Sequence, residues 1–571
     1  MRARVLGTAV AIAAALGPLA GSAAAGAWGP PMELGPVPDV GDVSGPSSAV
    51  ALAMDATGTA VVAWNDGTGV LSVARDPGAA RFTAGPPQRF GGVRPVTKPG
   101  AALDGTGRAL VVWVADGAVQ GLERPPGGPF ASLPALASGA ADSADVAFLA
   151  DGTALVAYAG ADGAVHIAQR PPGGAFAVSA LPATSGASVS RARIVAAGGY
   201  ALVTWTETTS SGSTTTSRAM ASVLIPGAGF DAPRALVTTT SDTAASALTA
   251  RVRWIEAAIN PAGAADVVVA WSVGGPMSSV AFVDCVDDTI ATRTAGPAGT
   301  WAAPVDDGGS ACQPNPAPQA AVAEGDQGDA LLLLGRSQSL GGMVVASRWR
   351  AAGSPTYGPG PDVFADPLAS RRGAWTGLAA LSGGRYLAAF VRGPNVLATV
   401  GTPAGGFGAP VTVGADPSTF TLEGIASNGT EAVVAWASSF SGARLPELRA
   451  ALYDDRASTP VATVFPIALS GLTLTRRRFA RPITIRWQVS VPATMTFGVA
   501  RLRGKRAVKV GSFARPAHPG VNQLRFAGVL HGHRLRPGRY RLTAVATAPG
   551  MAPSPPASVT FVVRRLSRGR G

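Results

Sequence analysis

The amino-acid sequence predicts an all-β protein with more than one domain. Glycine (73 residues) and proline (47 residues) make up about a fifth of the 571 residues, which suits many turns between short strands rather than long helices. A pattern of about ten residues recurs along most of the chain. The chain is longer than one ordinary domain, and a hydrophobic content of 47% is enough for a sizeable core.

The recurring pattern is first seen as DATGTAVVAW, which begins at Asp55 and ends on Trp64. Similar stretches are DGTGRALVVW, LADGTALVAY, NPAGAADVVVAW and ASNGTEAVVAW, with weaker copies in EGDQGDALLLL and LSGGRYLAAF. We take the last residue of each copy as its marker. The eight markers, spaced by 45 to 66 residues, are Trp64, Trp113, Tyr158, Trp205, Trp271, Leu334, Phe390 and Trp436. Spacing of this kind indicates one unit of four short strands and their turns per repeat.

Each repeat continues in a similar way after its marker. A turn and a strand that ends near an arginine come next, as in VLSVARDPG, followed by a short piece with an aromatic residue and often a proline, as in FTAGPPQ. The last repeat has a poor version of this piece, but residues 28–34 (WGPPMEL) have the same pattern. The repeats resemble the blades of a β-propeller. The resemblance implies an eight-bladed propeller over residues 26–466, with seven blades as the alternative, closed by the N-terminal strand near Trp28.

The marker residues have two interpretations. The Asp or Asn and the Gly before each apolar run predict a tight turn, and the unbroken run itself predicts a strand buried on both faces. The repeated aromatics are therefore expected to fill the space between neighbouring blades. The alternative is a repeated ligand site. In the Asp-box of sialidases the Gly and Trp lie close together in a turn, whereas five or six residues separate them here.

A different pattern begins at residue 467. About seven short strand-like stretches follow within roughly 100 residues, a number and size typical of a β-sandwich. The stretch LRPGRYRL, which begins at Leu535, resembles the L-x-P-G-x-Y segment of immunoglobulin-like or fibronectin-like domains in exported bacterial proteins. The resemblance implies such a domain over residues 467–563, followed by a basic tail over residues 564–571.

The two regions differ in charge. Residues 467–571 contain 20 Lys and Arg and no Asp or Glu, whereas the rest of the chain has 27 basic and 34 acidic residues, a net charge of −7. A domain without carboxylates attracts polyanions, so we expect attachment to an anionic cell envelope. The alternative is an arginine-rich solvated surface without a binding role, which reflects codon usage. No nucleic-acid partner is expected. The candidate anion contacts are Arg476, Arg477, Arg478, Arg501, Arg503, Arg506, Arg534, Arg536 and Arg539.

The N-terminus predicts export. Arg2 and Arg4 precede an apolar run, and the small residues of Ala23-Ala24-Ala25 offer a cleavage site, which indicates a signal peptide over residues 1–25. Nothing later approaches the length of a membrane span, so we expect a secreted, extracellular protein that is monomeric and associates with the envelope at most by non-covalent contacts.

The sequence offers few candidates for disulfide or metal chemistry. In an oxidising compartment Cys285 and Cys312 are expected to form a disulfide. We expect no cofactor. A Ca²⁺ ion at the acidic side chains is the weaker alternative, and a metal at the histidines is disfavoured because structural zinc sites usually have four ligands that include Cys. The acidic residues are Asp284, Asp287, Asp288, Asp306 and Asp307, and the histidines are His518, His531 and His533.

The function that the sequence favours is binding or adhesion. The propeller would be a platform for a carbohydrate or protein partner, and the basic domain would attach it to the envelope. The alternatives are a glycoside hydrolase or lyase with paired carboxylates on the propeller, sialidase-like in its site, or a purely structural surface protein. No catalytic residues can be assigned, and an enzyme is the less favoured reading. Residues 208–217, 238–254 and 284–316 depart from the repeat, and loop insertions of this kind are the expected contact surface.

Overall fold

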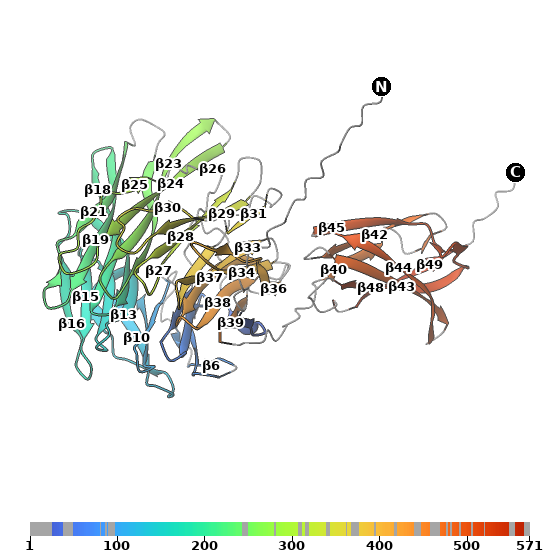
Figure 1. Ribbon diagram of the computed structural model, residues 1–571, viewed down its shortest axis with the longest axis horizontal. Helices are drawn as coiled ribbons and strands as arrows, with labels where there is room; N and C mark the ends of the chain where they lie inside the picture. The colour runs from blue at the N-terminus through green and yellow to red at the C-terminus, as the bar shows by residue number, and fades with distance from the viewer. Residues whose placement is uncertain are drawn as a thin grey trace, which may run out of the picture.

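The computed structural model is all-β in the residues that it describes (Figure 1). The described part contains strands and turns but no helix, and hence no helix able to cross a membrane. The predicted signal peptide lies outside it, as does the basic tail after residue 564. The described residues are 26–37, 50–79, 81–85, 88–89, 98–242, 249–278, 281–306, 311–313, 319–337, 343–360, 363–366, 376–392, 395–415, 419–438, 447–456, 469–474, 478–479, 482–489, 493–503, 506–518, 520–547, 554 and 556–564.

In the described part of the chain, eight antiparallel sheets of four or five strands lie between residues 27 and 454. The first sheet has β3 (Val50–Met54), β4 (Ala60–Asn65), β5 (Gly69–Arg75), β6 (Thr83–Ala84) and β7 (Gln88–Arg89). The second has β8 (Gly100–Leu103), β9 (Ala109–Ala115), β10 (Ala118–Arg124), β11 (Ala131–Ser132) and β12 (Ala137–Ser138). The third has β13 (Ala140–Phe148), β14 (Ala154–Gly160), β15 (Val165–Arg170) and β16 (Ala177–Leu181). The fourth has β17 (Ser188–Ala197), β18 (Tyr200–Ser211), β19 (Thr214–Ile225), β20 (Gly229–Phe230) and β21 (Arg234–Asp242).

The remaining four sheets repeat this order. The fifth has β22 (Thr249–Ile259), β23 (Ala265–Ser278), β24 (Ala281–Arg293), β25 (Val305–Asp306) and β26 (Ala311–Gln313). The sixth has β27 (Gln319–Glu324), β28 (Ala330–Ser337), β29 (Met343–Arg350), β30 (Gly358–Pro359) and β31 (Phe364–Asp366). The seventh has β32 (Thr376–Leu381), β33 (Arg385–Arg392), β34 (Asn395–Thr402), β35 (Gly406–Phe407) and β36 (Val411–Ala415). The eighth has β37 (Thr419–Ser427), β38 (Glu431–Ser438) and β39 (Glu447–Asp454), joined by β1 (Ala27–Trp28) and β2 (Met32–Pro36).

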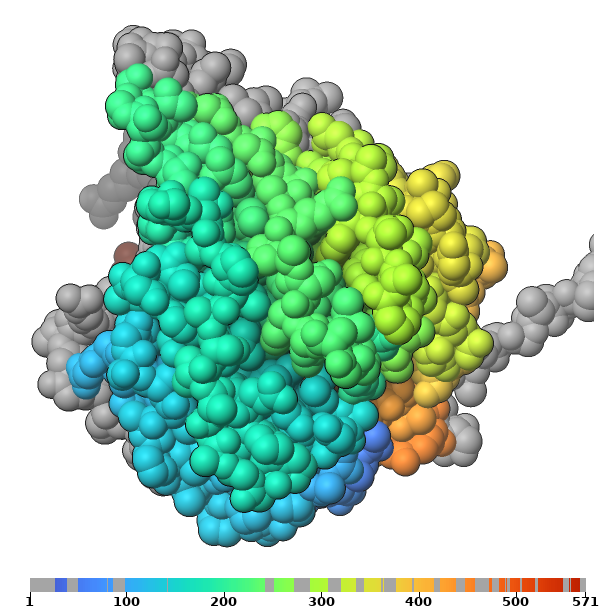
Figure 2. Space-filling model, turned by 90° about the vertical axis from the view of Figure 1, so that its left-hand side faces the viewer, coloured from blue at the N-terminus to red at the C-terminus, as the bar shows by residue number. Residues whose placement is uncertain are grey.

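The eight sheets form a closed ring. The first strands of successive sheets contact one another from β3 to β37, and β37 contacts β3. Figure 2 shows the sheets following one another around the ring in chain order. The Ser143 hydroxyl accepts a hydrogen bond from the backbone N–H of Ala192 (2.9 Å), and the Asp145 carboxylate accepts one from Ile194 (3.2 Å). In both hydrogen bonds the two residues are 49 positions apart in the sequence, so β13 and β17 run side by side in the same direction. The ring is consistent with the predicted propeller.

The N-terminal strands lie in the eighth sheet, where β1 and β2 pair with β39. The ring of Trp28 packs on that of Tyr453, with centroids 5.1 Å apart. The indole N–H of Trp64 in the first sheet donates to the carbonyl oxygen of Pro36 in β2 (2.8 Å). A Cβ atom at Gly35 would lie only 2.9 Å from the Trp64 ring. The eighth sheet thus contains strands from both ends of the repeat region.

The recurring motif forms the turn and the second strand of each sheet. The Asp55 carboxylate accepts hydrogen bonds from the backbone N–H groups of Thr57 and Thr59, both 2.9 Å, and Gly58 has φ 92°. This is the turn chemistry that the sequence predicts. The strands that follow are buried, as in β4, where every residue is buried. Seven of the eight markers are also buried, namely Trp64, Trp113, Tyr158, Trp205, Leu334, Phe390 and Trp436.

The arginine that ends the third strand is a structural residue in several sheets. Arg75 donates to the Glu431 carboxylate of the neighbouring sheet (2.9 Å) and to the carbonyl oxygen of Gly58 (3.0 Å). Arg350 binds Asp266 of the preceding sheet in the same way (2.7 Å). A buried guanidinium needs such partners, because an unpaired charge in the interior is costly. The buried members of this set are Arg75, Arg124, Arg293 and Arg350.

The C-terminal region has two larger sheets and a hairpin. One sheet has β40 (Leu469–Leu474), β42 (Ile483–Val489) and β45 (Gly520–Phe526). The other has β41 (Arg478–Phe479), β49 (Ala557–Val563), β48 (Gly538–Thr547), β43 (Ala493–Arg503) and β44 (Arg506–Ala517), and the hairpin has β46 (Val529–Leu530) and β47 (His533–Arg534). The two sheets share one core, in which Trp487 of the first packs on Phe497 of the second. The Tyr540 hydroxyl donates to the carbonyl oxygen of Arg536 (2.7 Å).

Candidate functional site

Four of the eight innermost strands contain β-bulges, and each of these four strands has a charged residue in a bulge. A bulge adds residues to one strand of a pair and redirects the side chain that it carries, and bulges are common next to functional sites. The four strands are β13, β17, β22 and β37, and in each of them the pairing register with the second strand of the same sheet shifts at the bulge. The charged residues in these bulges are Asp142, Arg191, Arg253 and Glu423.

The bulges lie at one height in the ring. The bulge in β17 lies opposite the marker Trp205. Those in β13, β22 and β37 lie next to the strand partners of the markers Tyr158, Trp271 and Trp436. Because the markers occupy equivalent positions in their repeats, the four charged residues surround the axis at the level where the innermost strands begin. Lys98, just before β8, lies near the same level of the second sheet.

The charges of different sheets interact across the axis. Enclosure by the ring and the positive charge of Arg193 lower the pKa of the Lys98 ammonium. Glu256 and Glu423 oppose this shift through their negative charges. Lys98, Glu256 and Glu423 belong to the second, fifth and eighth sheets, which are not neighbours, so their interaction passes through the middle of the ring. We call this group the charged collar: Lys98, Asp142, Asp145, Arg191, Arg193, Arg251, Arg253, Glu256 and Glu423.

Three arginines of the fourth and fifth sheets dominate the outer part of the collar. Burial and the charges of Arg251 and then Arg191 lower the pKa of Arg253 to about 10. The pKa of Arg191 is also lowered, chiefly by desolvation and then by Arg251, while Asp142 opposes the shift. Arg191 and Arg251 are exposed to solvent and Arg253 is half-buried. Desolvation is the main cause of both shifts, and the like charges of the neighbouring guanidinium groups add to it.

Asp145 and Glu256 lie three positions further along their strands than the bulge residues Asp142 and Arg253. Asp145 accepts hydrogen bonds from backbone N–H groups of its own strand and of β17, and a Cβ atom at Gly100 would lie 2.7 Å from its Oδ1. Glu256 is open to solvent but surrounded by the ring, and this enclosure raises the pKa of its carboxyl. Lys98 and Arg193 act in the opposite direction. The collar therefore joins a net positive part at the level of the bulges to these two carboxylates further along the strands.

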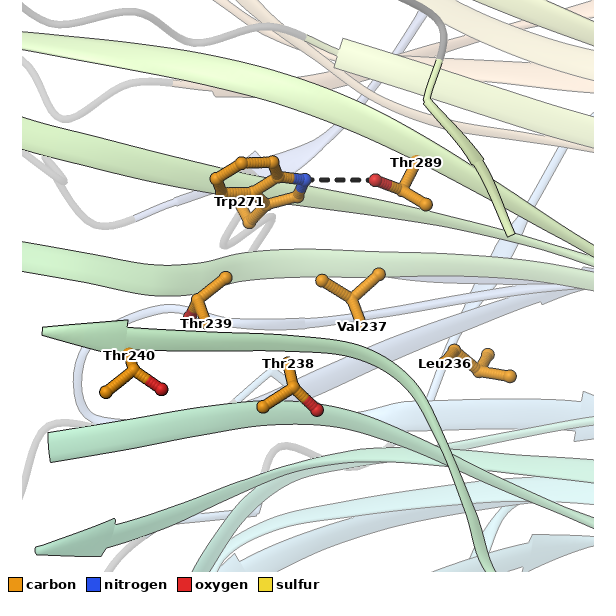
Figure 3. A pocket seen from close by; sticks show the side chains of 7 residues that line it. All are labelled: Leu236, Val237, Thr238, Thr239, Thr240, Trp271 and Thr289. Carbon is orange, nitrogen blue, oxygen red and sulfur yellow. Dashed lines mark hydrogen bonds between the residues drawn. The ribbon is translucent and has the colours of Figure 1, made fainter. Parts of the chain in front are cut away.

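A groove of about 320 Å³ lies between the fourth and fifth sheets (Figure 3). It is in the region of the sequence insertions, where β18, β19, β23 and β24 are long strands of 12 to 14 residues. The indole N–H of Trp271 donates to the Thr289 hydroxyl (3.0 Å). The lining residues are Leu236, Val237, Thr238, Thr239, Thr240, Trp271 and Thr289.

Trp271 departs from the expectation that every marker aromatic fills the space between sheets. It is half-buried, whereas the other seven markers are buried. On β21, Val237 and Thr239 point towards Trp271, whereas Thr238 and Thr240 point to the other side of the strand (Figure 3). Small side chains leave part of the indole uncovered. An aromatic surface beside hydroxyl groups is typical of a ligand groove that combines apolar contact with hydrogen bonding.

The predicted anion contacts of the C-terminal region are only partly described. Arg476 and Arg477 lie outside the described residues, as does the side chain of Arg478. Arg501 is half-buried and donates to the carbonyl oxygen of Pro537 (2.9 Å). Arg503 and Arg506 are directly opposite each other in the β43–β44 pair. The exposed members are Arg503, Arg506, Arg534, Arg536 and Arg539.

The two cysteines are strand partners. Cys285 in β24 is directly opposite Cys312 in β26. The structure does not show a disulfide between them, because their side chains lie outside the described residues, and the disulfide stays a prediction.

The candidate metal ligands are only partly described. The side chains of Asp284 and Asp287, and the whole of Asp307, lie outside the described part, whereas Asp288 is buried and Asp306 is exposed. The histidines at positions 518, 531 and 533 are exposed. Within the described residues no group of three or more His, Cys, Asp or Glu is placed to hold a metal ion.

Comparisons with known proteins give a fold likeness and no family. No family model matches the sequence, and no curated protein matches it. Among solved structures, the chain is similar to the WD40 domain of SCAP from fission yeast (8% identity, TM-score 0.38, covering 72% of this chain and 95% of that one). It is also similar to the polysaccharide lyase Uly1 (8% identity, TM-score 0.37, covering 62% of this chain and 89% of that one). A third similar structure is the fucose-specific lectin from Aleuria aurantia (8% identity, TM-score 0.28, covering 62% of this chain and 93% of that one).

Sequence reasoning located the groove region but missed the collar. Residues 238–254 were expected as part of a contact surface because they depart from the repeat, and they contain both the threonines of the groove and Arg251 and Arg253. The paired arginines in RARIV and RVRWI were a visible signal. Their convergence depends on β-bulges, which the sequence pattern does not reveal.

Proposed function

We propose that the protein is an exported or cell-surface carbohydrate-binding protein, built as an eight-bladed β-propeller with an immunoglobulin-like attachment domain. The observation that carries the proposal is the half-buried Trp271 in a threonine-lined groove. The closed ring of sheets and the shared core of the two C-terminal sheets support the architecture. The Tyr540–Arg536 hydrogen bond supports the second domain, because a similar tyrosine bond occurs in immunoglobulin-like sandwiches.

The groove suits an uncharged sugar. The apolar face of a sugar ring can stack on an indole, and its hydroxyls can exchange hydrogen bonds with threonine hydroxyls. The hydrogen bond from Trp271 to Thr289 fixes the indole in place, which lowers the entropy lost on binding. No charged residue lines the groove in the described part of the chain. The chemistry therefore favours a neutral glycan over an acidic one at this position.

Binding of neutral oligosaccharides to the chain over residues 26–571 tests the proposal. We expect Trp271→Ala to weaken binding about tenfold or more, since truncation of an aromatic anchor in an interface costs about 2 kcal/mol or more. Trp349→Ala is the matched control, because Trp349 is also half-buried but lies in the sixth sheet, away from the groove. Equal binding by the two variants would exclude the groove, and the absence of binding to any neutral glycan would overturn the function.

The C-terminal domain is proposed as the attachment module. It has 20 basic residues and no carboxylates, and at least five of its arginines are exposed. Retention of the full chain on anionic cell-wall polymers should fall steeply with salt, because exposed charges are screened. Replacing Arg503, Arg506, Arg534, Arg536 and Arg539 by Ser should abolish this retention at low salt. A variant that is retained like the wild type would contradict the attachment role.

A glycoside hydrolase or lyase is the second candidate, favoured by the carboxylates in the collar. Glu256 has a raised pKa, as expected of a general acid, and the Asp145 carboxylate accepts two backbone hydrogen bonds that hold it in place. Turnover of a glycan by the wild type and its loss in Glu256→Gln and Asp145→Asn, with binding retained, would establish this activity. Unchanged turnover in both variants would exclude it.

A further inference from the structure

Arg191 has a strained backbone inside a strand. Its φ is 57°, a region that non-glycine residues rarely adopt because it strains the backbone. The other non-glycine residues with positive φ in the described part are Asp116 and His531, and both precede a glycine in a hairpin turn, where this conformation is ordinary. Arg191 instead lies in the bulge of β17. No turn accounts for its conformation.

The bulges of two adjacent sheets bring like charges together. Arg191 in β17 and Arg253 in β22 are both bulge residues, and β17 contacts β22. Arg251 lies two residues before Arg253 in β22, and its positive charge helps to lower the pKa of both Arg191 and Arg253. Within the described residues the guanidinium groups of Arg191 and Arg251 donate no hydrogen bond, in contrast to the buried arginines between sheets. Strain and charge repulsion in one place are typical of a binding site whose ligand relieves them.

We propose that Arg191, Arg251 and Arg253 bind the carboxylate of an acidic sugar at the axial opening of the ring. The planar guanidinium fork matches a carboxylate in two parallel hydrogen bonds. None of the three arginines lines the groove at Trp271, and binding at the arginines does not depend on a neutral glycan there.

The charge distribution of the collar favours a singly charged sugar over a polyanion. The three arginines lie at the outer end with one carboxylate, Asp142, nearby. Asp145 and Glu256, together with Arg193, lie further along their strands than the bulge residues, whereas Glu423 and Lys98 lie near the level of the bulges. A second negative group on the ligand would meet these carboxylates and be repelled, whereas sugar hydroxyls could donate hydrogen bonds to them. A uronic acid has this combination of one carboxylate and several hydroxyls.

The test measures the affinity of the chain over residues 26–571 for methyl glucuronide, with methyl glucoside as the uncharged analogue. A probe with a single charge limits non-specific attraction to the basic domain. We expect Arg191→Ala and Arg253→Ala each to weaken glucuronide binding about tenfold or more, because a charge-assisted hydrogen bond contributes that much. Arg253→Lys should lose most of the affinity as well, since Lys keeps the charge but not the fork.

Two arginines serve as matched controls, Arg234→Ala on the exposed outer strand β21 and Arg539→Ala in the basic domain. Both should bind glucuronide like the wild type, as should Trp271→Ala, which separates this site from the groove. A loss of binding in Arg539→Ala alone, or wild-type affinity in the collar variants, would overturn the proposal. Displacement of glucuronide by methyl phosphate at lower concentration than by acetate would overturn the assignment of a carboxylate.

A stability measurement distinguishes the loss of a binding group from misfolding of the variant. Arg191→Gly removes the guanidinium and suits the positive φ, so its melting temperature should equal or exceed that of the wild type while glucuronide binding is lost. A lower melting temperature would show that Arg191 stabilises the fold, and the strain argument would then be wrong.

Discussion

The carboxylate of Asp145 accepts a hydrogen bond from the backbone N–H of Ile194, in the next sheet of the ring. The bond joins two innermost strands, β13 and β17, which have no backbone ladder between them. Hydrogen bonds from side chains therefore connect these two sheets near the axis of the ring. The neighbouring bond from Ala192 to the Ser143 hydroxyl has the same role.

Asp145→Ala should destabilise the ring by about 1–3 kcal/mol, because it leaves the N–H of Ile194 without its partner. Asp145→Asn should cost less, since the amide oxygen can still accept the bond. Tryptophan fluorescence during urea unfolding would report on the ring, which holds most of the tryptophans. Equal stability of Asp145→Ala and the wild type would show that water replaces the carboxylate.

The buried ionic group between the fifth and sixth sheets should make stability depend on pH. Arg350 binds both Asp266 and Glu324, at 2.7 Å each. Burial, and then the hydrogen bond with Asp266, raise the pKa of Glu324 to about 10. The folded protein therefore keeps a proton that the unfolded chain loses above the ordinary pKa of 4.5. Stability from this group is full below that pH and falls as the pH rises towards 10.

Glu324→Gln should remove this pH dependence and stabilise the protein by about 1–3 kcal/mol at pH 8. Asp266→Asn is the contrasting variant, because it takes the main counter-ion from a buried guanidinium and should destabilise by about 3–5 kcal/mol. Thermal unfolding at pH 5 and pH 8 would distinguish the two. A Glu324→Gln variant with the same pH profile as the wild type would mean that Glu324 is ionised in the fold.

Cys285 and Cys312 are opposite one another in β24 and β26, so a disulfide between them would close a loop within the fifth sheet. We expect mass spectrometry of the unreduced protein to find the linked peptides. Reduction should then lower stability by roughly 3 kcal/mol, the value expected for a loop of this length. Alkylation of both thiols in denaturant without a reductant would disprove the disulfide.

Gly35→Ala should weaken the closure of the ring by about 1–3 kcal/mol. A methyl group there would lie 2.9 Å from the Trp64 ring, and the φ of 149° disfavours a side chain. Gly29→Ala is the matched control in the same segment, because its nearest contact would be an ordinary 3.7 Å from the carbonyl oxygen of Leu452. A similar effect of both substitutions on unfolding would argue against the contact with Trp64.

The repeat could be predicted from the sequence because its signals are local. The Asp55 turn needs only residues within five positions, and the apolar run after it needs only a strand buried on both faces. The collar could not be predicted in this way. Arg191 and Arg253 are brought to one level by bulges, which arise from the pairing of whole strands. The exposure of Trp271 likewise depends on which residues of β21 lie opposite it.

The pairing of Trp28 with Tyr453 has a consequence for how the ring is made. The strand that closes the eighth sheet is synthesised first, but its partner is among the last parts of the ring to appear. Until then β1 and β2 have no partner strand, and contacts so distant in sequence form slowly. During this interval the N-terminal strand could pair with the eighth sheet of another copy. Assembly at high concentration is thus the step at which exchanged dimers would arise.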